Sequence, residues 1–457
     1  MKSLMRIHFF PALLPLTAVL PWLLSAVGVV ASFFVRRGRF RTAVKVLAVT
    51  CLVGAAALFA RHWQKQKSLQ GSRLTPVDAL PVSTPAEVPT PSAGGVSPTR
   101  LKGWERLSPR HNLSTPAIGD GLVLVGTTEG TLDAYRLGDG APLWSLRKSE
   151  PIYVRPAIVG VRAYVGEGLH TAMSSKLTAV SLPDGKPIWE RQFLGHLEAT
   201  PLVDATTNTL WFGAGPQGAW ALDTESGEVR WRAEIGHVDA TPLLTADRKL
   251  LVIPAHVETD PSQTILYALE PESGREIWRL PLPGQPWVAP LEDRATGNIL
   301  ATTSVGRLGP RTPDERGWAF AIRRTGSAPM IEWQQPFPGM PLFNGAQDPE
   351  LRITFHSLKA GQILALENRT GKIQWSIHLG ADLHAPATWL GGKPARLGAL
   401  TVDGFLHLID PRTGKRVRKL PFSVGSSSSP AAAEIGGESA IIVVTPEAVA
   451  MLPAAEK

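Results

Sequence analysis

Histidine and carboxylate side chains recur at one spacing in this sequence of 457 residues. Three times a His stands five residues before a Pro, and two of these stretches, GHLEATP and GHVDATP, add a carboxylate two residues after the His. A later repeat offers one further His. The candidate metal ligands are His111, His196, Glu198, His237, Asp239 and His384. Imidazole nitrogens and carboxylate oxygens can together bind a divalent metal ion.

A single cysteine limits the other chemistry open to the chain. Cys51 is the only one in the sequence, and it lies inside an apolar run. An intramolecular disulfide and a cysteine-based zinc site are therefore excluded. The stretch SVGSSSS around Ser426 lacks the second glycine of a nucleophile elbow, and the sequence contains no phosphate-binding loop. These features favour a binding protein over an enzyme.

The net charge of +8 does not indicate nucleic-acid binding. Much of the basic excess flanks apolar segments near the amino terminus, from Arg36 to Lys45 and from Arg61 to Lys67. Such positions are typical of membrane-flanking charges. The remaining chain has no dense run of Lys and Arg interleaved with aromatic residues, so we expect no nucleic-acid partner.

Residues 1–67 are predicted to form a membrane anchor. Residues 9–35 are apolar and uncharged over a length that can cross a bilayer. A cleaved signal peptide is the alternative, but the run is long for one and no small-residue cleavage site precedes Arg36. Residues 42–60 are predicted to form a second transmembrane segment. The short positive loop between the two segments favours a cytoplasmic loop, with both chain ends outside.

Residues 68–100 differ in composition from what precedes and follows them. Six prolines between residues 74 and 100 stand among Ser, Thr, Ala and Gly. Such a composition cannot form a core and favours extended, polyproline-like conformations. We therefore predict a semi-rigid linker that lifts the following domain off the membrane.

A repeat of about 40 to 55 residues indicates the fold class. Its clearest copy, AVSLPDGKPIW, reads as a strand, a tight turn ending in Gly, and a strand carrying Trp. Another pair of short strands is expected upstream of each copy, beginning at a Pro, so each repeat supplies one four-stranded propeller blade. The tryptophans expected to dock between blades are Trp104, Trp144, Trp189, Trp231, Trp278, Trp333 and Trp375.

The two ends of the repeat region supply the blade count. Residues 101–107 resemble a lone outer strand carrying Trp104, and residues 430–453 supply three inner strands that lack an outer one. We predict that the two segments join in an eighth blade, so that residues 101–457 form a closed, all-β, eight-bladed propeller without an open sheet edge. Two copies of the repeat are degenerate, one with an insertion before Trp333 and one with Arg418 where Trp is expected.

This architecture places the candidate ligands. They lie in the connections that enter the innermost strands, so they should ring one mouth of the central channel. They could bind a metal ion or a small ligand, or they could only line the mouth and satisfy backbone donors. Because the blades are separated, their side chains need not meet. We therefore favour polar lining and expect no bound metal or cofactor.

The insertion from Arg307 to Trp318 stands out in an otherwise economical blade. It is long and charged, with the sequence RLGPRTPDERGW. Long loops on rigid scaffolds often carry contacts to partners, although an insertion can also be merely tolerated. We expect this segment to contribute to a partner surface.

The stretches Ala221–Trp231 and Ala365–Trp375 resemble the tryptophan-docking repeat of pyrroloquinoline-quinone (PQQ)-type propellers. The resemblance covers residues 101–457 and implies one of two branches, the quinone-dependent dehydrogenases or non-catalytic propellers similar to BamB, an outer-membrane barrel-assembly lipoprotein. The dehydrogenases characteristically carry adjacent cysteines, a calcium site and a catalytic Asp, and none of these can be matched to positions of this chain. The resemblance therefore implies a BamB-like, extracytoplasmic propeller.

These observations combine into one predicted function. We expect a protein anchored in the cytoplasmic (inner) membrane, with its propeller on the periplasmic side acting as a scaffold for a protein partner and without catalytic residues. A PQQ-dependent dehydrogenase is the alternative. A ligand or metal sensor that uses the histidines at the channel mouth is the second alternative.

Overall fold

The computed structural model describes residues 74–75, 102–257, 260–307, 310–325, 328–342, 345–348, 350–422 and 425–454. All of them belong to one compact unit, Ser72–Lys457. The predicted transmembrane segments 9–35 and 42–60, and nearly all of the predicted linker 68–100, lie outside the described residues and stay predictions. Within the described ranges no helix has the length and apolar character needed to cross a membrane.

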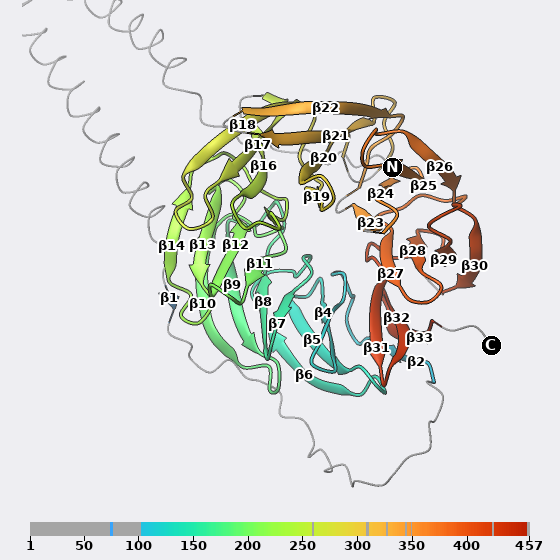
Figure 1. Ribbon diagram of the computed structural model, residues 1–457. Helices are drawn as coiled ribbons and strands as arrows, with labels where there is room; N and C mark the ends of the chain where they lie inside the picture. Colours follow the sequence, from blue (N-terminus) through green and yellow to red (C-terminus); the bar gives the residue numbers. More distant parts are fainter. Residues whose placement is uncertain are drawn as a thin grey trace, which may run out of the picture. The chain divides into compact units, whose positions relative to one another are not determined.

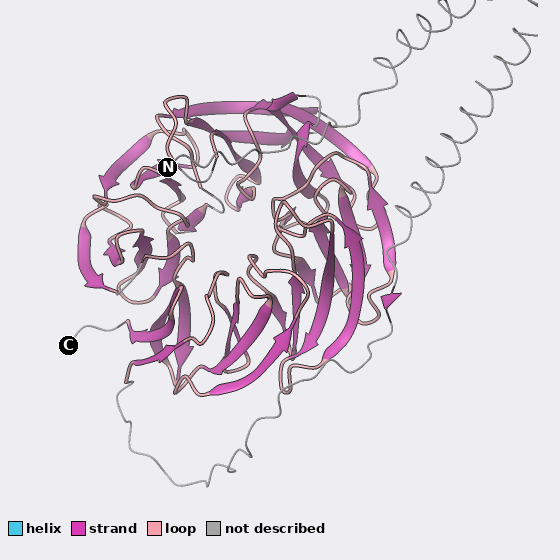
Figure 2. Cartoon of the chain, turned by 180° about the vertical axis from the view of Figure 1, so that it is seen from behind, coloured by secondary structure: helices cyan, strands magenta, loops and turns pink. Residues whose placement is uncertain are grey.

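The described chain is a ring of eight sheets, which confirms the predicted eight-bladed, all-β propeller (Figure 1). Seen from behind, strands and connecting loops surround the same central axis (Figure 2). Each blade is an antiparallel meander whose first strand is innermost and whose fourth is outermost. Consecutive strands therefore run in opposite directions. The connections from second to third strand and from one blade to the next share one face, and the turns from third to fourth strand lie on the other.

The first four blades follow one another along the chain. Their strands are β3 (Ala117–Gly119), β4 (Leu122–Gly126), β5 (Thr131–Arg136) and β6 (Pro142–Arg147) in blade 1; β7 (Ala157–Val159), β8 (Arg162–Gly166), β9 (Ser174–Ser181) and β10 (Pro187–Leu194) in blade 2; β11 (Leu202–Asp204), β12 (Thr209–Gly213), β13 (Ala219–Asp223) and β14 (Val229–Ala233) in blade 3; and β15 (Leu243–Leu244), β16 (Leu251–Val257), β17 (Asp260–Leu269) and β18 (Glu276–Pro283) in blade 4.

The remaining blades complete the ring. Their strands are β19 (Leu291–Asp293), β20 (Asn298–Val305), β21 (Arg316–Thr325) and β22 (Ala328–Phe337) in blade 5; β23 (Ala346–Asp348), β24 (Ile353–Leu358), β25 (Gln362–Glu367) and β26 (Ile373–His378) in blade 6; β27 (Thr388–Gly391), β28 (Arg396–Thr401), β29 (Phe405–Ile409) and β30 (Arg416–Pro421) in blade 7; and β31 (Ala431–Ile435), β32 (Glu438–Thr445), β33 (Ala448–Pro453) and β2 (Trp104–Leu107) in blade 8.

Blade 8 combines the two ends of the described chain. β2 pairs antiparallel with β33, with Trp104 opposite Met451, so the first strand of the propeller forms the outer edge of its last blade. Blade 8 packs against blade 1 through a cluster that joins Ile442 and Val449 to Val123 and Val125. The ring is thus closed by hydrogen bonds within one sheet and by an apolar interface to the next.

The second and third strands of the blades carry the core. β4, β12 and β24 are buried along their whole length, because each sheet is covered on both faces by its neighbours. One apolar cluster joins Leu124 and Leu132 of blade 1 to Val165 and Val180 of blade 2. Corresponding clusters lie between other pairs of blades. The propeller therefore has a series of cores between its blades.

Blade 2 differs from the predicted four-stranded pattern. A two-residue strand, β1 (Leu74–Thr75), pairs antiparallel with β10, so this sheet has five strands. β1 comes from the segment predicted as linker. The outermost strand of a blade exposes unpaired backbone groups that an extended segment can bind. The composition of residues 68–100 did not reveal that part of this segment would pair in this way.

The repeat tryptophans lie where successive blades meet. In the outer hairpin of blade 1, Trp144 stands opposite Ala134, and a register shift follows directly. The same Ala–Trp pair and shift recur in blades 2 to 6. Six indole N–H groups donate to a backbone carbonyl of the next blade, at 2.7 to 3.0 Å: Trp104 to Leu137, Trp144 to Leu182, Trp189 to Thr224, Trp231 to Pro271, Trp333 to Asn368 and Trp375 to Pro411.

In six of the described repeat turns, the glycine contacts the tryptophan of the preceding blade. Gly185 has a φ of +71°, and a Cβ built there would lie 2.5 Å from a ring carbon of Trp144. The turn therefore needs glycine twice, for its backbone conformation and for the space that the indole takes. The remaining such contacts are Gly140 with Trp104, Gly227 with Trp189, Gly274 with Trp231, Gly371 with Trp333 and Gly414 with Trp375.

Candidate functional site

A central cavity of about 600 Å³ opens among the innermost strands. Residues just before the first strands of all eight blades line it, among them Thr115, Arg155, Thr200 and Ser429. Short inner strands and the connections that enter them therefore set its shape. Three predicted site residues, Glu198, Asp239 and His384, lie in its wall.

The structure brings four of the six candidate ligands together. His196 and Glu198 lie in the connection from β10 to β11, and His237 and Asp239 lie in the connection from β14 to β15. The two connections enter neighbouring blades on one face of the ring. Their identical spacing therefore places matching side chains next to each other across the blade boundary.

His196, His237 and Asp239 form the tightest part of the cluster. The Nε2 atoms of both histidines lie 3.0 Å from Asp239 Oδ1 and 3.2 Å from each other. His237 Nε2 is also 2.9 Å from Asp239 Oδ2. The Asp239 residue is 9% exposed and His196 is 5% exposed. Two imidazoles and a carboxylate thus converge on one point from two connections.

The charge of Asp239 is set by this contact. Burial raises the pKa of its carboxyl group, but the hydrogen bonds of His196 and His237 outweigh burial and hold that pKa well below its ordinary range. Asp239 Oδ2 is buried and accepts no hydrogen bond of acceptable geometry, although His237 Nε2 is nearby. The site therefore contains a buried carboxylate with one oxygen left without a hydrogen bond.

Two further histidines join the cluster that the sequence pattern missed. His256 lies near the end of β16, and its backbone N–H donates to the backbone carbonyl of His237 at 2.8 Å. Its Nε2 is buried without a hydrogen-bond partner and lies 3.9 Å from Asp239 Oδ2. Burial lowers the pKa of His256 to about 4, so its imidazole is neutral at neutral pH. His256 has no counterpart at a repeated spacing, and only the pairing of His237 with β16 reveals its position.

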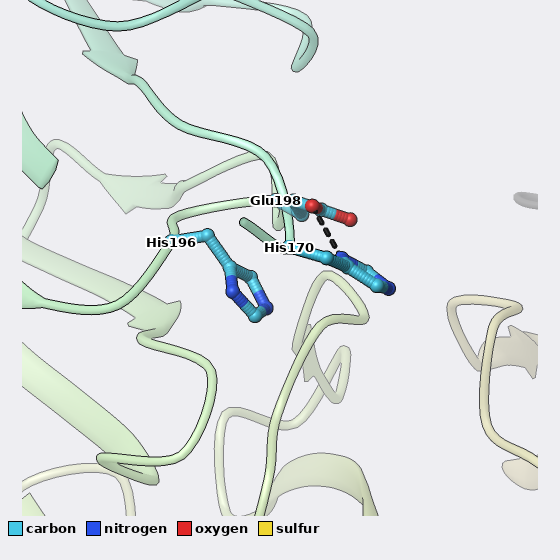
Figure 3. A group of neighbouring side chains, drawn as sticks. All are labelled: His170, His196 and Glu198. Carbon is cyan, nitrogen blue, oxygen red and sulfur yellow. Dashed lines mark hydrogen bonds and ion pairs between the residues drawn. The ribbon is translucent and has the colours of Figure 1, made fainter. Parts of the chain in front are cut away.

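His170 lies in the connection from β8 to β9 and pairs with Glu198 (Figure 3). Its Nδ1 is 2.5 Å from Glu198 Oε1, and this hydrogen bond raises the pKa of His170 above its ordinary value. The His170 ring stacks on His196 with centroids 4.8 Å apart and on Trp287 at 5.7 Å. Burial raises the pKa of the nearby Tyr153 to about 12, and the negative charge of Glu198 contributes to this increase.

The remaining two candidate ligands lie elsewhere. His111 is exposed, and its backbone N–H donates to Glu129 at 3.3 Å. His384 lines the cavity from the connection between β26 and β27. Two groups of three potential ligands occur among the described residues. One consists of His170, His196 and Glu198, and the other of His196, His237 and Asp239. Neither group includes His111 or His384. The shared spacing before Pro did not bring all its members to one point.

The insertion between β20 and β21 lies on the same face and is tied to two blades. The buried Lys359 of blade 6 donates from Nζ to the carbonyls of Arg307 at 2.9 Å and Pro310 at 3.2 Å. It also pairs with Glu315 at 2.5 Å. Further along the ring, Arg311 Nε lies 3.5 Å from Asp382 Oδ2. The described residues of the insertion therefore extend from blade 5 toward blade 7 and are held in place by a buried ion pair.

The geometry of the ring defines the class of protein. Eight four-stranded blades form a closed ring, and an indole N–H crosses most of the boundaries between them. The chain is a tryptophan-docking β-propeller of the PQQ type. A family model described as outer membrane protein assembly factor BamB matches residues 102–280 and 154–377, more than half of the chain. The chain belongs to this BamB family.

Individual relatives include assembly factors and enzymes. BamB of Yersinia pestis is 29% identical over 29% of this chain and 36% of its own length. Tetrathionate hydrolase of Acidithiobacillus ferrooxidans is 21% identical over 67% of this chain and 66% of its own length. The 1-butanol dehydrogenase (quinone) of Thauera butanivorans is 25% identical over 45% and 35%. In each case the match covers less than two thirds of the relative.

Proposed function

We propose that this chain is a non-catalytic scaffold of the cell envelope, anchored by its amino-terminal apolar segments with the propeller on the extracytoplasmic side. The observation that carries the proposal is the BamB family match over more than half of the chain. BamB is named as an assembly factor for outer membrane proteins, and an assembly factor acts by binding other proteins. A closed propeller suits this role because its blades hold many surface loops rigidly.

The face that carries the insertion is the partner surface that the geometry favours. Lys359 and Arg311 fasten the segment to blades 6 and 7, so a partner would find it already ordered. A preordered loop loses less conformational entropy when it binds. The Arg311 side chain is 58% exposed even while it pairs with Asp382, so a partner can still reach it.

Site-specific photo-cross-linking in membranes tests the proposal. A photoreactive amino acid at position 311 should capture an envelope protein that mass spectrometry then identifies. The matched position is Lys415, an exposed residue in the turn between β29 and β30 on the opposite face. Selective capture from position 311 supports the scaffold. Equal capture from both positions, or none from either, would contradict it.

A PQQ-dependent dehydrogenase is the second candidate, favoured by the quinone dehydrogenase relative. The residues of this chain do not fit that chemistry well. Cys51 is the only cysteine, so the adjacent pair characteristic of those enzymes cannot form. Reconstitution of the full chain with PQQ and calcium tests the candidate directly. Reduction of an electron-accepting dye with alcohols or sugars would replace the scaffold proposal with this one.

A further inference from the structure

We propose that His196, His237 and Asp239 bind a divalent first-row transition metal ion at the mouth of the central cavity. The proposal is independent of the scaffold function, since a scaffold can carry such an ion or lack one. The spacing of the ligand atoms, the unpaired polar atoms at the site and the shape of the surroundings all favour a bound ion.

The ligand atoms are spaced as they would be around one ion. Metal–nitrogen and metal–oxygen bonds of about 2.0 to 2.2 Å place neighbouring ligand atoms about 2.9 to 3.5 Å apart, depending on the angle between the bonds. His196 Nε2, His237 Nε2 and Asp239 Oδ1 are separated by 3.0, 3.0 and 3.2 Å. Two imidazoles and one carboxylate are a ligand set that zinc and other first-row ions accept.

Hydrogen bonds alone satisfy this arrangement poorly. If both histidines carried a proton on Nε2, two hydrogens would crowd toward one oxygen, Asp239 Oδ1, within the 3.2 Å that separates the nitrogens. If either Nε2 were unprotonated, its lone pair would face an ionised carboxylate. Asp239 is nine-tenths buried, and its Oδ2 accepts no hydrogen bond. A cation between the three side chains would pair with every one of these atoms.

The surroundings leave room for the ion and supply a fourth donor. The buried Nε2 of His256 has no hydrogen-bond partner and lies 3.9 Å from Asp239 Oδ2, so a small side-chain rotation would bring it to the ion. Gly215 lies beside the ring of His196, and a Cβ at this position would lie 3.1 Å from Nε2. Because glycine has no side chain, the space next to this nitrogen stays open. On the open side, Asp239 borders the central cavity, through which an ion can enter.

The neighbouring pair of His170 and Glu198 is a weaker site. These two side chains already bond to each other at 2.5 Å, so an ion there would have to break that contact. His170 is also half exposed, with 53% of its side chain accessible. The proposal therefore assigns the ion to His196, His237 and Asp239, with His170 stacked outside.

The test uses the purified full chain without a polyhistidine tag, stripped with a chelator and titrated separately with Zn²⁺ and Co²⁺. Calorimetry should give one ion per chain, and Co²⁺ should produce visible absorption bands of a nitrogen- and oxygen-ligated site. Loss of a partner that merely orients a ligand already costs about 10- to 100-fold in metal affinity. His237→Ala and Asp239→Asn should therefore weaken binding by about 100-fold or more.

The chain supplies a matched control. His111 occupies the same place before a Pro in blade 1 but is exposed and outside the cluster. His111→Asn should leave affinity and stoichiometry unchanged. Thermal unfolding separates lost ligands from lost fold, because Zn²⁺ should raise the melting temperature of the parent and His111→Asn but not of Asp239→Asn. No stoichiometric binding of either ion to the parent, or equal loss in His111→Asn, would overturn the proposal.

Discussion

The indole nitrogen of Trp144 donates to the carbonyl of Leu182, 38 residues later and in the next blade, at 2.7 Å. Gly185 lies against the face of the same indole. The same two blades also share an apolar cluster and the buried ion pair of Lys148 with Glu190. The ring of Trp144 therefore joins hydrogen bonding and packing at one blade boundary, and the repeat carries this arrangement around the propeller.

Replacing Trp144 should destabilise the propeller in two steps. Trp144→Phe keeps most of the apolar contact but leaves the Leu182 carbonyl without its donor, which should cost about 1 to 3 kcal/mol. Trp144→Ala also removes the buried ring and should cost about 3 to 5 kcal/mol. Denaturant unfolding of the full chain measures both values. If the two variants proved equally stable, the indole would not act through packing.

Substitution of Gly185 separates backbone strain from collision with the indole. Gly185→Ala meets both costs, since its φ is +71° and its Cβ would lie 2.5 Å from the ring. Gly121→Ala is the matched control, because Gly121 has a φ of +72° and open space around it. The control should cost about 1 kcal/mol and Gly185→Ala clearly more. In a Trp144→Ala background the excess should disappear, and its persistence would argue against a steric role.

Lys148 should be far more important for stability than its neighbour Lys176. Lys148 is 1% exposed and lies 2.5 Å from Glu190 and 3.4 Å from Glu167, both buried in blade 2. Lys148→Met leaves Glu167 without an ion-pair partner and Glu190 with only the partly exposed Lys176, and it should cost about 3 to 5 kcal/mol of unfolding free energy. Lys176 contacts the same Glu190 at 3.3 Å but is 30% exposed. Lys176→Met should cost about 1 kcal/mol or less, and comparable losses would contradict the importance of burial.

The sequence predicted the fold well because each blade repeats the same local requirement. A turn glycine must fit against the tryptophan of the preceding blade, so Gly and Trp recur together even where the rest of the repeat varies. Such a pattern is visible without knowing which blades touch. Strand β1 was missed because it is not part of the repeat. It pairs with the outer edge of blade 2, and no sequence pattern indicates which edge an added strand will bind.

The site was predictable only in part for a similar reason. The GHLEATP and GHVDATP stretches indicated that His196 and His237 occupy equivalent places, but not that the two connections bring them 3.2 Å apart. His256 joins them through backbone pairing of β16 with the His237 segment, a contact without a sequence motif. His111 has the right spacing but lies outside the cluster. Spacing therefore indicated which face carries these residues, and the three-dimensional arrangement of blades 2 to 4 determined which of them meet.

Stability should fall on acidification through His356. Burial lowers the pKa of this buried imidazole to about 4, against an ordinary value of 6.5. Between these pH values the unfolded chain binds a proton that the folded chain does not. The free energy of unfolding therefore keeps the full contribution of neutral His356 above pH 6.5 and loses it progressively toward pH 4. The decline should reach on the order of 3 kcal/mol. His356→Gln should show a shallower pH dependence in denaturant unfolding, and parallel curves would count against this origin.

The ion pair of Lys359 with Glu315 should control how firmly the insertion is held. Lys359 also donates to two carbonyls of that segment, so Lys359→Met removes three contacts at once and leaves the buried Glu315 carboxylate without its cation. Arg311 should then become more accessible to trypsin, with cleavage at this bond several-fold faster by mass spectrometry. Lys372→Met, at an exposed position of the same blade, should leave the rate unchanged.

A second variant separates release of the segment from general loss of stability. Lys359→Met combined with Glu315→Gln removes the buried charge, so the fold should recover much of its stability, because replacing both partners of a buried pair costs less than removing one. The two carbonyl contacts stay broken, so cleavage at Arg311 should stay fast. If the double variant recovered both stability and resistance to trypsin, cleavage in Lys359→Met would reflect global unfolding, and the carbonyl contacts from Lys359 would not be what orders the insertion.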